Sequence, residues 1–305
     1  MVDASSTGCK IMQRIAYCLL VHKNPKQVSR LLHRIYSPSD YFYVHAFTTQ
    51  DSPPRGSWPQ VVAEFGSNVT LRSKYGSSRG SFSLVEATLE AMDYLSHYQY
   101  DYFVNLSGQC YPLRSTEDIR RKLGSTNAAY LEYFKLDRWD GGPERVRYIW
   151  LRIGDRFVHI PRLSRTLPYE LEPYGGSQWM CLPKIFVDYV LDSVRTRPRI
   201  ARFYRYSRIP EEMFFQTIIM NSDLGKDVVN DNLRYICWGR EGDAHPAILR
   251  RGDIESIIAS GKLFARKFDT SVDESVLDMI DRKIERVQQG SERSSALEDR
   301  YRAVS

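Results

Sequence analysis

Several motifs that define other classes of protein are missing from this sequence. The five cysteines are odd in number and widely separated, and they include no Cys-x-x-Cys pair. This distribution argues against a zinc site or a disulfide framework, and it favours buried thiols in a reducing compartment. The chain also contains no Asp-x-Asp motif, which many enzymes use to hold a divalent metal beside a phosphate group. Any phosphate chemistry would therefore need another source of positive charge.

Long apolar runs are missing as well. No stretch approaches the ~20 apolar residues that cross a bilayer, and the first ten residues, MVDASSTGCK, are polar. We therefore expect neither a signal peptide nor a membrane anchor in the sequence as given, and we expect a cytoplasmic location.

The excess of positive charge is small. Lysine and arginine number 43 against 37 acidic residues, which gives a formal net charge of +6. The basic residues are spread along the chain, whereas a nucleic-acid-binding protein usually carries a dense basic stripe, so we predict no nucleic-acid partner. The charge suits an anionic ligand or a peripheral contact with an anionic membrane face, or it serves solubility alone.

The sequence does contain a clear alternation of strands and helices. With 42% apolar and 12% aromatic residues, the 305-residue chain can form a large packed core. An apolar periodicity typical of a helix runs from Pro25 to Ile35. Apolar runs of strand length surround it at 14–21, 41–45, 68–71 and 101–106. This alternation predicts an α/β fold with a mostly parallel sheet flanked by helices.

The second half of the chain is less regular. Residues 125–175 mix arginines with aromatics without a clean period, so we assign them to short strands and long loops over the sheet. They form either a ligand-binding region or a surface without function. Order returns with helices at 183–193 and 253–260, a strand at 233–238 and a last helix that carries Val276 and Val287. After Gly290 the sequence is polar, and we expect a poorly ordered tail.

Two adjacent acids, Glu211 and Glu212, follow Pro210 at the predicted start of an apolar helix. Proline is favoured at the first helical position, so both acids fall in the first turn. Carboxylates there can simply complement the helix dipole, which stabilises a helix by roughly 0.3–1 kcal/mol each. Alternatively, one of them is a catalytic base. The residues alone leave both interpretations open.

A basic pair, Arg266 and Lys267, lies between Phe264 and Phe268. The aromatic residues favour burial of the segment while the two charges need an anion, so the pair is a candidate phosphate site that needs no metal. An ion pair with nearby acids is the alternative. The turn Gly76–Ser81 lacks the Lys-Ser/Thr ending of a phosphate-binding loop, and we interpret it as a plain turn before a helix.

Seven sequence blocks resemble one known family in the same order. They are LLVHKNP with VSRLLHRIYSPSDYFYVH, then YFVNLSGQCYPL, GSQWMCL, PEEMFFQTIIMNS, DNLRYICW with a following HP, and LFARKFD. Between about residues 14 and 282 the chain is similar to the core-2/I-branching and xylosyltransferase group, glycosyltransferase family 14. The resemblance implies a GT-A-type fold, an inverting single displacement, a UDP-sugar donor and no metal or other cofactor.

The resemblance also assigns roles to individual residues. The family's base falls on Glu212, five residues before Thr217, and its diphosphate-binding pair falls on Arg266 and Lys267. Trp179 and Trp238 would contact the acceptor sugar, although a tryptophan buried in the core is the alternative for Trp238. The donor nucleotide would lie against Val21, His22, His45, Ser107 and Gly108.

Two positions depart from the family pattern. An acid near the uridine usually follows the second strand, but this chain has Ala46 there, and Arg79 stands where the family often has a tryptophan. The missing acid makes uridine specificity less secure than the fold, and it lends some support to a catalytically idle protein that binds glycans or nucleotides.

From these observations we expect one domain at 14–289, with a nucleotide-binding half at 14–124 and an acceptor and catalytic half at 125–289. Polar segments at 1–13 and 290–305 flank it. The expected activity is transfer of a sugar, N-acetylglucosamine first, from a UDP-sugar to a glycan or glycoconjugate hydroxyl. UDP-xylose and UDP-glucuronate are alternative donors. If an N-terminal anchor had been removed, the expected location would be the Golgi lumen.

Overall fold

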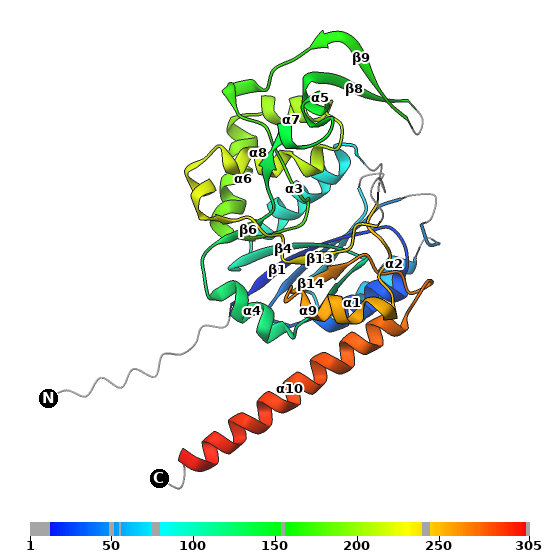
Figure 1. Cartoon of the computed structure of the whole chain (residues 1–305), viewed down its shortest axis with the longest axis vertical. Helices are drawn as coiled ribbons and strands as arrows, with labels where there is room; N and C mark the ends of the chain where they lie inside the picture. The colour runs from blue at the N-terminus through cyan, green and yellow to red at the C-terminus, as the bar shows by residue number, and fades with distance from the viewer. Residues whose placement is uncertain are drawn as a thin grey trace, which may run out of the picture.

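The computed structural model describes residues 13–48, 52–54, 56–74, 80–153, 156–239 and 245–302 (Figure 1). Most of the turn at Gly76–Ser81, including Arg79, lies outside these residues.

A seven-stranded sheet forms the centre of the molecule, with the strand order β12-β6-β11-β4-β1-β2-β3. Strands β4, β1, β2 and β3 are mutually parallel, as are β12 and β6, whereas β11 is antiparallel to both of its neighbours. The α/β class with a mostly parallel sheet is therefore confirmed. The strands are β1 (Ile15–Val21), β2 (Tyr41–Ala46), β3 (Val69–Arg72), β4 (Tyr102–Ser107), β6 (Ala129–Leu131), β11 (Met180–Pro183) and β12 (Val228–Val229).

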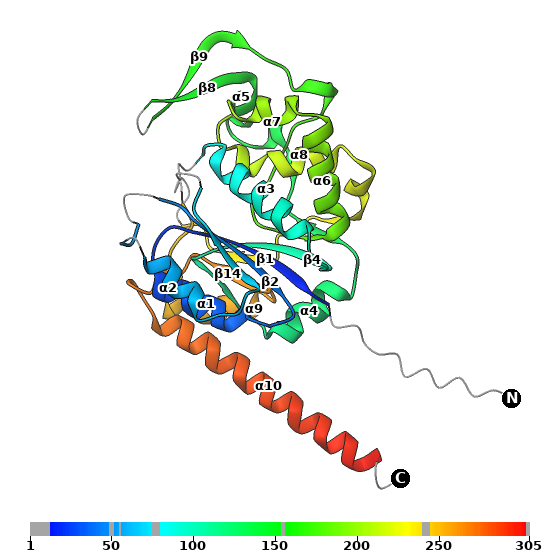
Figure 2. The same ribbon diagram turned by 180° about the vertical axis from the view of Figure 1, so that it is seen from behind.

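Helices cover both faces of this sheet (Figures 1 and 2). Alternate residues of β1 enter two separate apolar cores, Tyr17 and Leu19 on one face and Cys18 and Leu20 on the other. The first core is closed by α1 (Pro25–Ile35), α2 (Ser57–Ala63), α4 (Thr116–Gly124), α9 (Ile254–Ala259) and α10 (Ser275–Arg302). The second is closed by α3 (Ser83–Ser96), α5 (Gly142–Arg147), α6 (Lys184–Thr196), α7 (Arg199–Tyr204) and α8 (Phe214–Met220).

A smaller sheet of three strands lies at the end of β4. Its strands are β5 (Cys110–Pro112), β13 (Arg234–Ile236) and β14 (Phe264–Arg266), with β14 in the middle. Because β5 follows β4 after only two residues, this arrangement brings the basic pair at the end of β14 next to the carboxyl end of the central sheet. Residues more than 150 positions apart thus meet at the edge where ligands of open α/β sheets bind.

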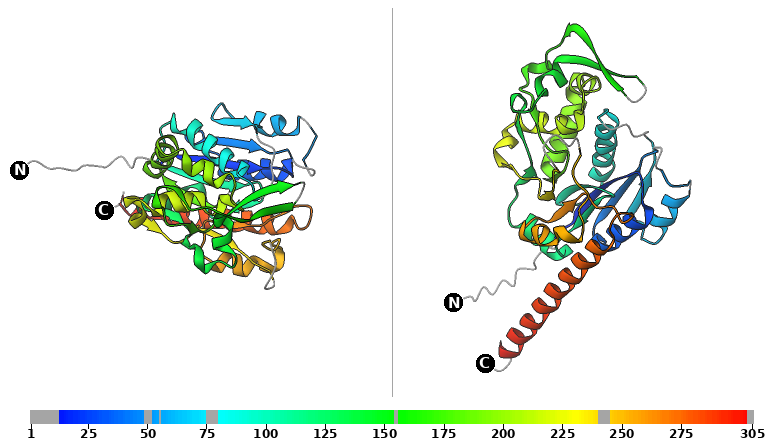
Figure 3. Two further views of the ribbon diagram at one scale, coloured as in Figure 1. Left: turned by 90° about the horizontal axis from the view of Figure 1, so that it is seen from above. Right: turned by 45° about the vertical axis from the view of Figure 1, so that its right-hand side comes forward.

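The middle of the chain forms short elements, as the sequence predicts, but two of its strands form a hairpin that projects from the rest of the protein. Strands β8 (Tyr148–Ile153) and β9 (Arg156–Ser164) form a two-stranded sheet with each other and project from the end of the molecule opposite α10 (Figure 3). The other short elements are β7 (Phe134–Lys135), β10 (Tyr174–Gly175), and the 3-10 turns η1 (Leu136–Arg138), η2 (Pro168–Glu170), η4 (Asp223–Asp227) and η5 (Arg251–Asp253).

The helix that was predicted to begin at Pro210 begins later. Residues Pro210–Glu212 form a 3-10 turn, η3, and Met213 has non-helical torsions (φ −140°, ψ −34°) before α8 starts at Phe214. The carbonyl oxygen of Glu212 accepts a hydrogen bond from the Gly176 amide at 2.9 Å and therefore does not continue a helical ladder. The two acids thus lie on a separate turn, and their placement in the first turn of the apolar helix was wrong.

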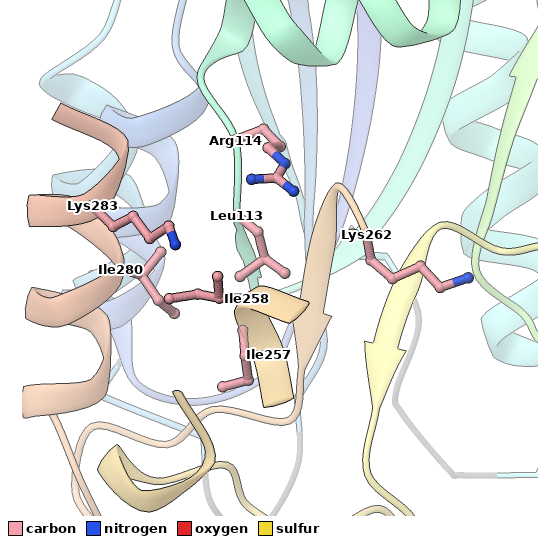
Figure 4. Close-up of a pocket in the computed structure, with 7 residues that line it drawn as sticks. All are labelled: Leu113, Arg114, Ile257, Ile258, Lys262, Ile280 and Lys283. Atoms are coloured by element: carbon pink, nitrogen blue, oxygen red, sulfur yellow. The ribbon is translucent and has the colours of Figure 1, made fainter. Parts of the chain in front are cut away.

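The last helix packs on the three-stranded sheet and α9. Figure 4 shows Ile280 and Lys283 of α10 facing Leu113, Ile257 and Ile258 across a cavity of about 10 Å³, which is no larger than one water molecule. The sequence predicted a poorly ordered tail after Gly290, but the helix continues to Arg302. A single glycine costs a helix only about 1 kcal/mol, so Gly290 does not end it. None of the helices in the described ranges is long and apolar enough to span a membrane.

Candidate active site

A cavity of about 910 Å³ opens at the carboxyl ends of β1 and β4, between the three-stranded sheet and turn η3. Most of the residues selected from the sequence line it, although they come from six separate segments of the chain. They are His22, Ser107, Trp179, Glu212, Trp238, Arg266 and Lys267.

The two neighbouring acids of η3 occupy different environments. Glu211 is only 5% exposed, and its Oε1 accepts a hydrogen bond of 3.1 Å from the Gly80 amide, which fixes the approach to α3. Glu212 is half-buried at the cavity wall, and its backbone is fixed by Ile209 on one side and Gly176 on the other. Both acids line the cavity, but Glu211 is the more buried of the two and holds Gly80, whereas Glu212 is the more accessible carboxylate.

An arginine lies close to both acids. Burial and the neighbouring Arg208 lower the pKa of Arg145, whereas the charges of Glu212 and Glu211 oppose that shift. Its guanidinium stacks 3.8 Å from the centre of the Trp139 ring, and Trp139 itself lines the cavity. The cavity therefore presents a carboxylate and an aromatic ring, with the Arg145 guanidinium stacked on that ring.

Positive charge enters the cavity at the end of β14. Arg266 pairs with Ile236 of β13 and Cys110 of β5, and its guanidinium lies 4.6 Å from the centre of the Trp179 ring. Trp179 is only 3% exposed, so its ring supports Arg266, and it lines the same cavity as Trp238. We call the group His22, Ser107, Gln109, Arg266 and Lys267 the basic wall.

Buried hydrogen bonds hold the basic wall from behind. Gln27, which is 2% exposed, donates to the carbonyl oxygens of Gly108 (2.8 Å) and Phe268 (3.2 Å), and its own oxygen accepts from the Thr270 amide. The Phe268 amide donates to the Gln109 carbonyl at 2.9 Å. These bonds join α1, the turn after β4 and the segment after β14 into one unit.

An ion pair completes this unit. Asp269 is 4% exposed and accepts hydrogen bonds from Lys23 Nζ (2.6 Å), Asn24 Nδ2 (2.9 Å) and Ser271 Oγ (2.6 Å). Burial alone would raise the pKa of Asp269, but the bonds from Lys23 and Ser271 outweigh it and lower the pKa to about 2. The carboxylate is therefore charged at neutral pH. Its bonds to Lys23 and Asn24 fix the position of the chain just after Lys267.

A second group of lining residues is more aromatic and more exposed. Trp238 is 61% exposed, which is unusual for so large an apolar side chain. Burial raises the pKa of Glu132, and a hydrogen bond from Asn232 partly offsets that effect. We call the group Glu132, Phe134, Trp139, Arg152 and Trp238 the aromatic wall.

Three residues that the sequence analysis assigned to the donor do not reach the cavity. His45 is fully buried against Phe47, at 4.5 Å between ring centres, and burial lowers its pKa. Val21 is fully buried as well, and Gly108 allows close packing, because a Cβ atom there would lie 2.8 Å from Val28. The side chains of His45 and Val21 are therefore buried away from this cavity, and a contact of these residues or of Gly108 with the donor stays a prediction.

The sequence analysis missed several polar or aromatic residues that line the cavity, among them Gln109, Gln178, Glu132, Trp139 and Arg152. Gln109 could have been found, because it follows Ser107 and Gly108 in the turn after a buried strand. Arg152 and Trp139 could not, because they belong to the irregular region 125–175, where no periodicity fixes the direction of a side chain.

Comparison with known proteins gives consistent matches. Residues 15–258 match the family described as "Branch: Core-2/I-Branching enzyme". Xylosyltransferase 2 of Rattus norvegicus is 29% identical over 299 residues, which cover 88% of this chain and 33% of the relative. Xylosyltransferase 1 of Canis lupus familiaris is 26% identical over 296 residues, covering 88% and 30%. The chain thus spans about a third of the length of these curated relatives.

Among solved structures, the apo form of mouse xyloside xylosyltransferase 1 is similar, with a TM-score of 0.40 and 9% sequence identity. The match covers 83% of this chain and 97% of that protein.

Proposed function

The chain belongs to the Core-2/I-branching enzyme family, and from this premise we propose that it is an inverting glycosyltransferase that moves a sugar from a UDP-sugar to a hydroxyl group of a glycan. One observation carries the proposal: a carboxylate, Glu212, and a basic pair, Arg266 and Lys267, line the same cavity at the carboxyl edge of the sheet. A displacement reaction needs these two groups, a base on one side and positive charge on the other.

In the proposed reaction the Glu212 carboxylate accepts the proton of the acceptor hydroxyl group. The acceptor oxygen then forms a bond to the anomeric carbon from the face opposite UDP, while the bond between that carbon and the phosphate oxygen breaks. The electron pair of the broken bond leaves with UDP, and the configuration at the anomeric carbon inverts. Arg266 and Lys267 stabilise the departing diphosphate by charge-assisted hydrogen bonds.

The proposal needs no divalent metal. The sequence contains no Asp-x-Asp motif, and two adjacent cations supply the positive charge that a metal provides in other transferases. We therefore expect turnover to persist in excess EDTA, measured with the UDP-sugar that the chain uses.

The aromatic wall faces this reaction from the acceptor side. An exposed indole such as Trp238 offers the flat apolar surface on which a sugar ring packs, and Glu132 and Arg152 offer hydrogen bonds to hydroxyl groups. This wall supports a glycan acceptor in the proposal.

For the donor sugar, we expected N-acetylglucosamine first. The names of the relatives, xylosyltransferases 1 and 2, favour xylose as a second candidate, and glucuronate is the remaining alternative. A panel of UDP-sugars measured by slow hydrolysis and by thermal stabilisation would choose among them, because a bound donor raises the melting temperature by mass action.

Glu212→Gln tests the mechanism directly. Because glutamine cannot accept the proton, we expect turnover to fall by about a hundredfold to ten-thousandfold, while the affinity for UDP, measured by calorimetry, stays at the parental value. Glu211→Gln is the matched control. Its side-chain oxygen can still accept the bond from Gly80, so we expect turnover within about tenfold of the parent.

Undiminished turnover in Glu212→Gln would rule out the proposed base, and loss of parental turnover in EDTA would rule out the metal-free mechanism. A catalytically idle glycan-binding protein, the alternative class, would bind glycan without any affinity for UDP.

A further inference from the structure

The two faces of the β8–β9 hairpin differ in composition. Cross-strand partners share a face of an antiparallel pair, so Leu151 and Val158 lie on one face together with Ile153 and its partner Arg156. By alternation along β9, Ile160 lies on that face too. We call this the outer face. The opposite face carries the pairs Trp150 with His159 and Arg152 with Phe157.

The opposite face, which we call the inner face, packs on the body of the protein. Trp150 Nε1 donates to the Glu144 carbonyl at 3.0 Å, and the Arg208 guanidinium lies 5.2 Å from the centre of the Trp150 ring. Phe157 lies against Gly80, 3.4 Å from where a Cβ atom would be, and Arg152 lines the cavity. The inner face is therefore occupied by contacts with the body of the protein, whereas the outer face is exposed to solvent.

The outer face is aliphatic and exposed. Leu151, Ile153, Val158 and Ile160 are 39%, 66%, 48% and 38% exposed, and Leu163 in the irregular part of β9 is 49% exposed. Within the described ranges, twelve large apolar side chains are exposed, and these five belong to one hairpin. A cluster of this kind marks an interaction surface, whereas single exposed apolar residues need no explanation.

The charge along the hairpin is mostly positive. Residues 145–165 contain six arginines and no lysine, with Asp155 as the one acid. Arg156 lies on the outer face itself, opposite Ile153, and Arg162 is exposed on the same strand. Helix α7, next to the base of the hairpin, adds Arg199 and Arg202, whereas Arg205 pairs with Glu86 at 2.7 Å and Arg208 stacks on Trp150 of the inner face. The apolar face therefore carries Arg156 itself and has the exposed Arg162 on the same strand.

The base of the hairpin is firmly held. The Arg165 guanidinium donates to the carbonyl oxygens of Val146, Tyr148, Phe203 and Tyr206 and to Ser207 Oγ, at 2.6 to 3.1 Å. The Trp150 amide donates to the Tyr206 carbonyl at 2.9 Å. The ribbon thus projects from the body at a fixed angle, at the end of the molecule farthest from α10 (Figures 1 and 2).

From this geometry we propose that the outer face of the hairpin docks on the surface of a bilayer that contains anionic phospholipids. Aliphatic side chains enter the boundary between headgroups and acyl chains, and arginines beside them pair with lipid phosphates. A protein partner is a poorer match, because protein interfaces are enriched in aromatic residues, and here the aromatic residues lie on the inner face. A second copy of the chain would bring the same cations together, which is repulsive.

This inference does not depend on the proposed activity and is tested without it. The full chain is mixed with sucrose-loaded vesicles of phosphatidylcholine, alone or with phosphatidylserine, and sedimented at low and high salt. We expect binding to the mixed vesicles only, weakened by salt because the charge contribution is screened. Ile153→Ser with Val158→Ser should lower binding by about tenfold or more, because two aliphatic side chains leave the lipid.

Ile185→Ser with Val287→Ser is the matched control, since these residues are 61% and 52% exposed but lie outside the hairpin. Its binding should equal that of the parent. Arg156→Gln with Arg162→Gln should also reduce binding by about tenfold or more, whereas Arg121→Gln with Arg195→Gln, exposed elsewhere, should not.

Three results would overturn the inference. The parent could fail to sediment with the mixed vesicles, or the hairpin variants could bind as the parent does. The parent could also elute as a dimer that Ile153→Ser with Val158→Ser converts to a monomer, which would make the outer face a contact between copies. Unchanged melting temperatures would show that the variants remain folded.

Discussion

The two walls of the cavity are built in different ways. Behind the basic wall lie Gln27, at 2% exposure, and Asp269, at 4%, and their hydrogen bonds join segments more than 240 residues apart. On the aromatic wall, Trp238 is 61% exposed and Arg152 belongs to a projecting hairpin. A wall held from behind presents its charges in one geometry, as a fixed leaving group requires. The more exposed aromatic wall can accept acceptor glycans of different shape. We therefore expect single substitutions to reduce activity more on the basic wall than on the aromatic wall.

The largest expected effect in this comparison comes from Lys267→Ala. Because the ammonium group would balance charge that develops on the diphosphate, its loss should lower kcat by about a hundredfold to a thousandfold. Calorimetry should also show weaker binding of UDP itself, which separates this variant from Glu212→Gln.

Lys226→Ala, exposed on η4 away from the cavity, is the control and should behave as the parent. If Lys267→Ala bound UDP with parental affinity, the basic wall would not be the diphosphate site, and the two walls would lose their proposed division of roles.

A smaller effect is expected from Asp269→Asn, which removes a charge behind the basic wall. The pKa of Asp269 is about 2 in the folded protein, against about 3.9 in an unfolded chain. A lowered pKa stabilises the fold above the unfolded value, and this contribution is lost as the pH falls from about 4 towards 2. The variant should therefore lose roughly 2 kcal/mol in free energy of unfolding at neutral pH.

The difference between parent and variant should shrink as the pH falls through that window, measured by urea unfolding at a series of pH values. The donor KM should rise as well, since Asp269 fixes the chain next to Lys267. A constant difference at every pH would mean that the ion pair with Lys23 does not hold the wall.

The sequence predicted the regular half of the fold well, and the physical reason is burial on both sides. All seven residues of β1 are buried, and Val28, Leu31, Leu32 and Ile35 of α1 face the core at helical spacing. Such patterns are local, so they are visible in one sequence. The same reasoning misplaced the start of α8, because the hydrogen bond that ends η3 comes from Gly176, which is 36 residues away from Glu212.

The same distinction between local and long-range patterns applies to the site residues. Residues next to a clear strand or helix, such as His22, Ser107 and Arg266, do line the cavity. His45 lies within β2 and is fully buried, and the direction of a strand side chain depends on which face of the sheet is covered, which one sequence does not show. The outer face of the β8–β9 hairpin escaped notice because a strand that is apolar on one face normally turns that face inward. Only the three-dimensional arrangement shows that it points to solvent.

The smallest effect is expected on the aromatic wall. Trp238→Ala should raise the acceptor KM by about tenfold, because the stacking surface for a sugar ring is lost, while kcat changes little. The side chain is largely exposed, so the melting temperature should hardly move, and Trp238→Phe should recover most of the affinity because it keeps an aromatic face. Steady-state kinetics with the donor at saturation compares the parent with both variants. If Trp238→Ala instead abolished turnover, or if phenylalanine gave no recovery, the indole would contribute to the reaction itself, and the aromatic wall would be as sensitive to single residues as the basic wall.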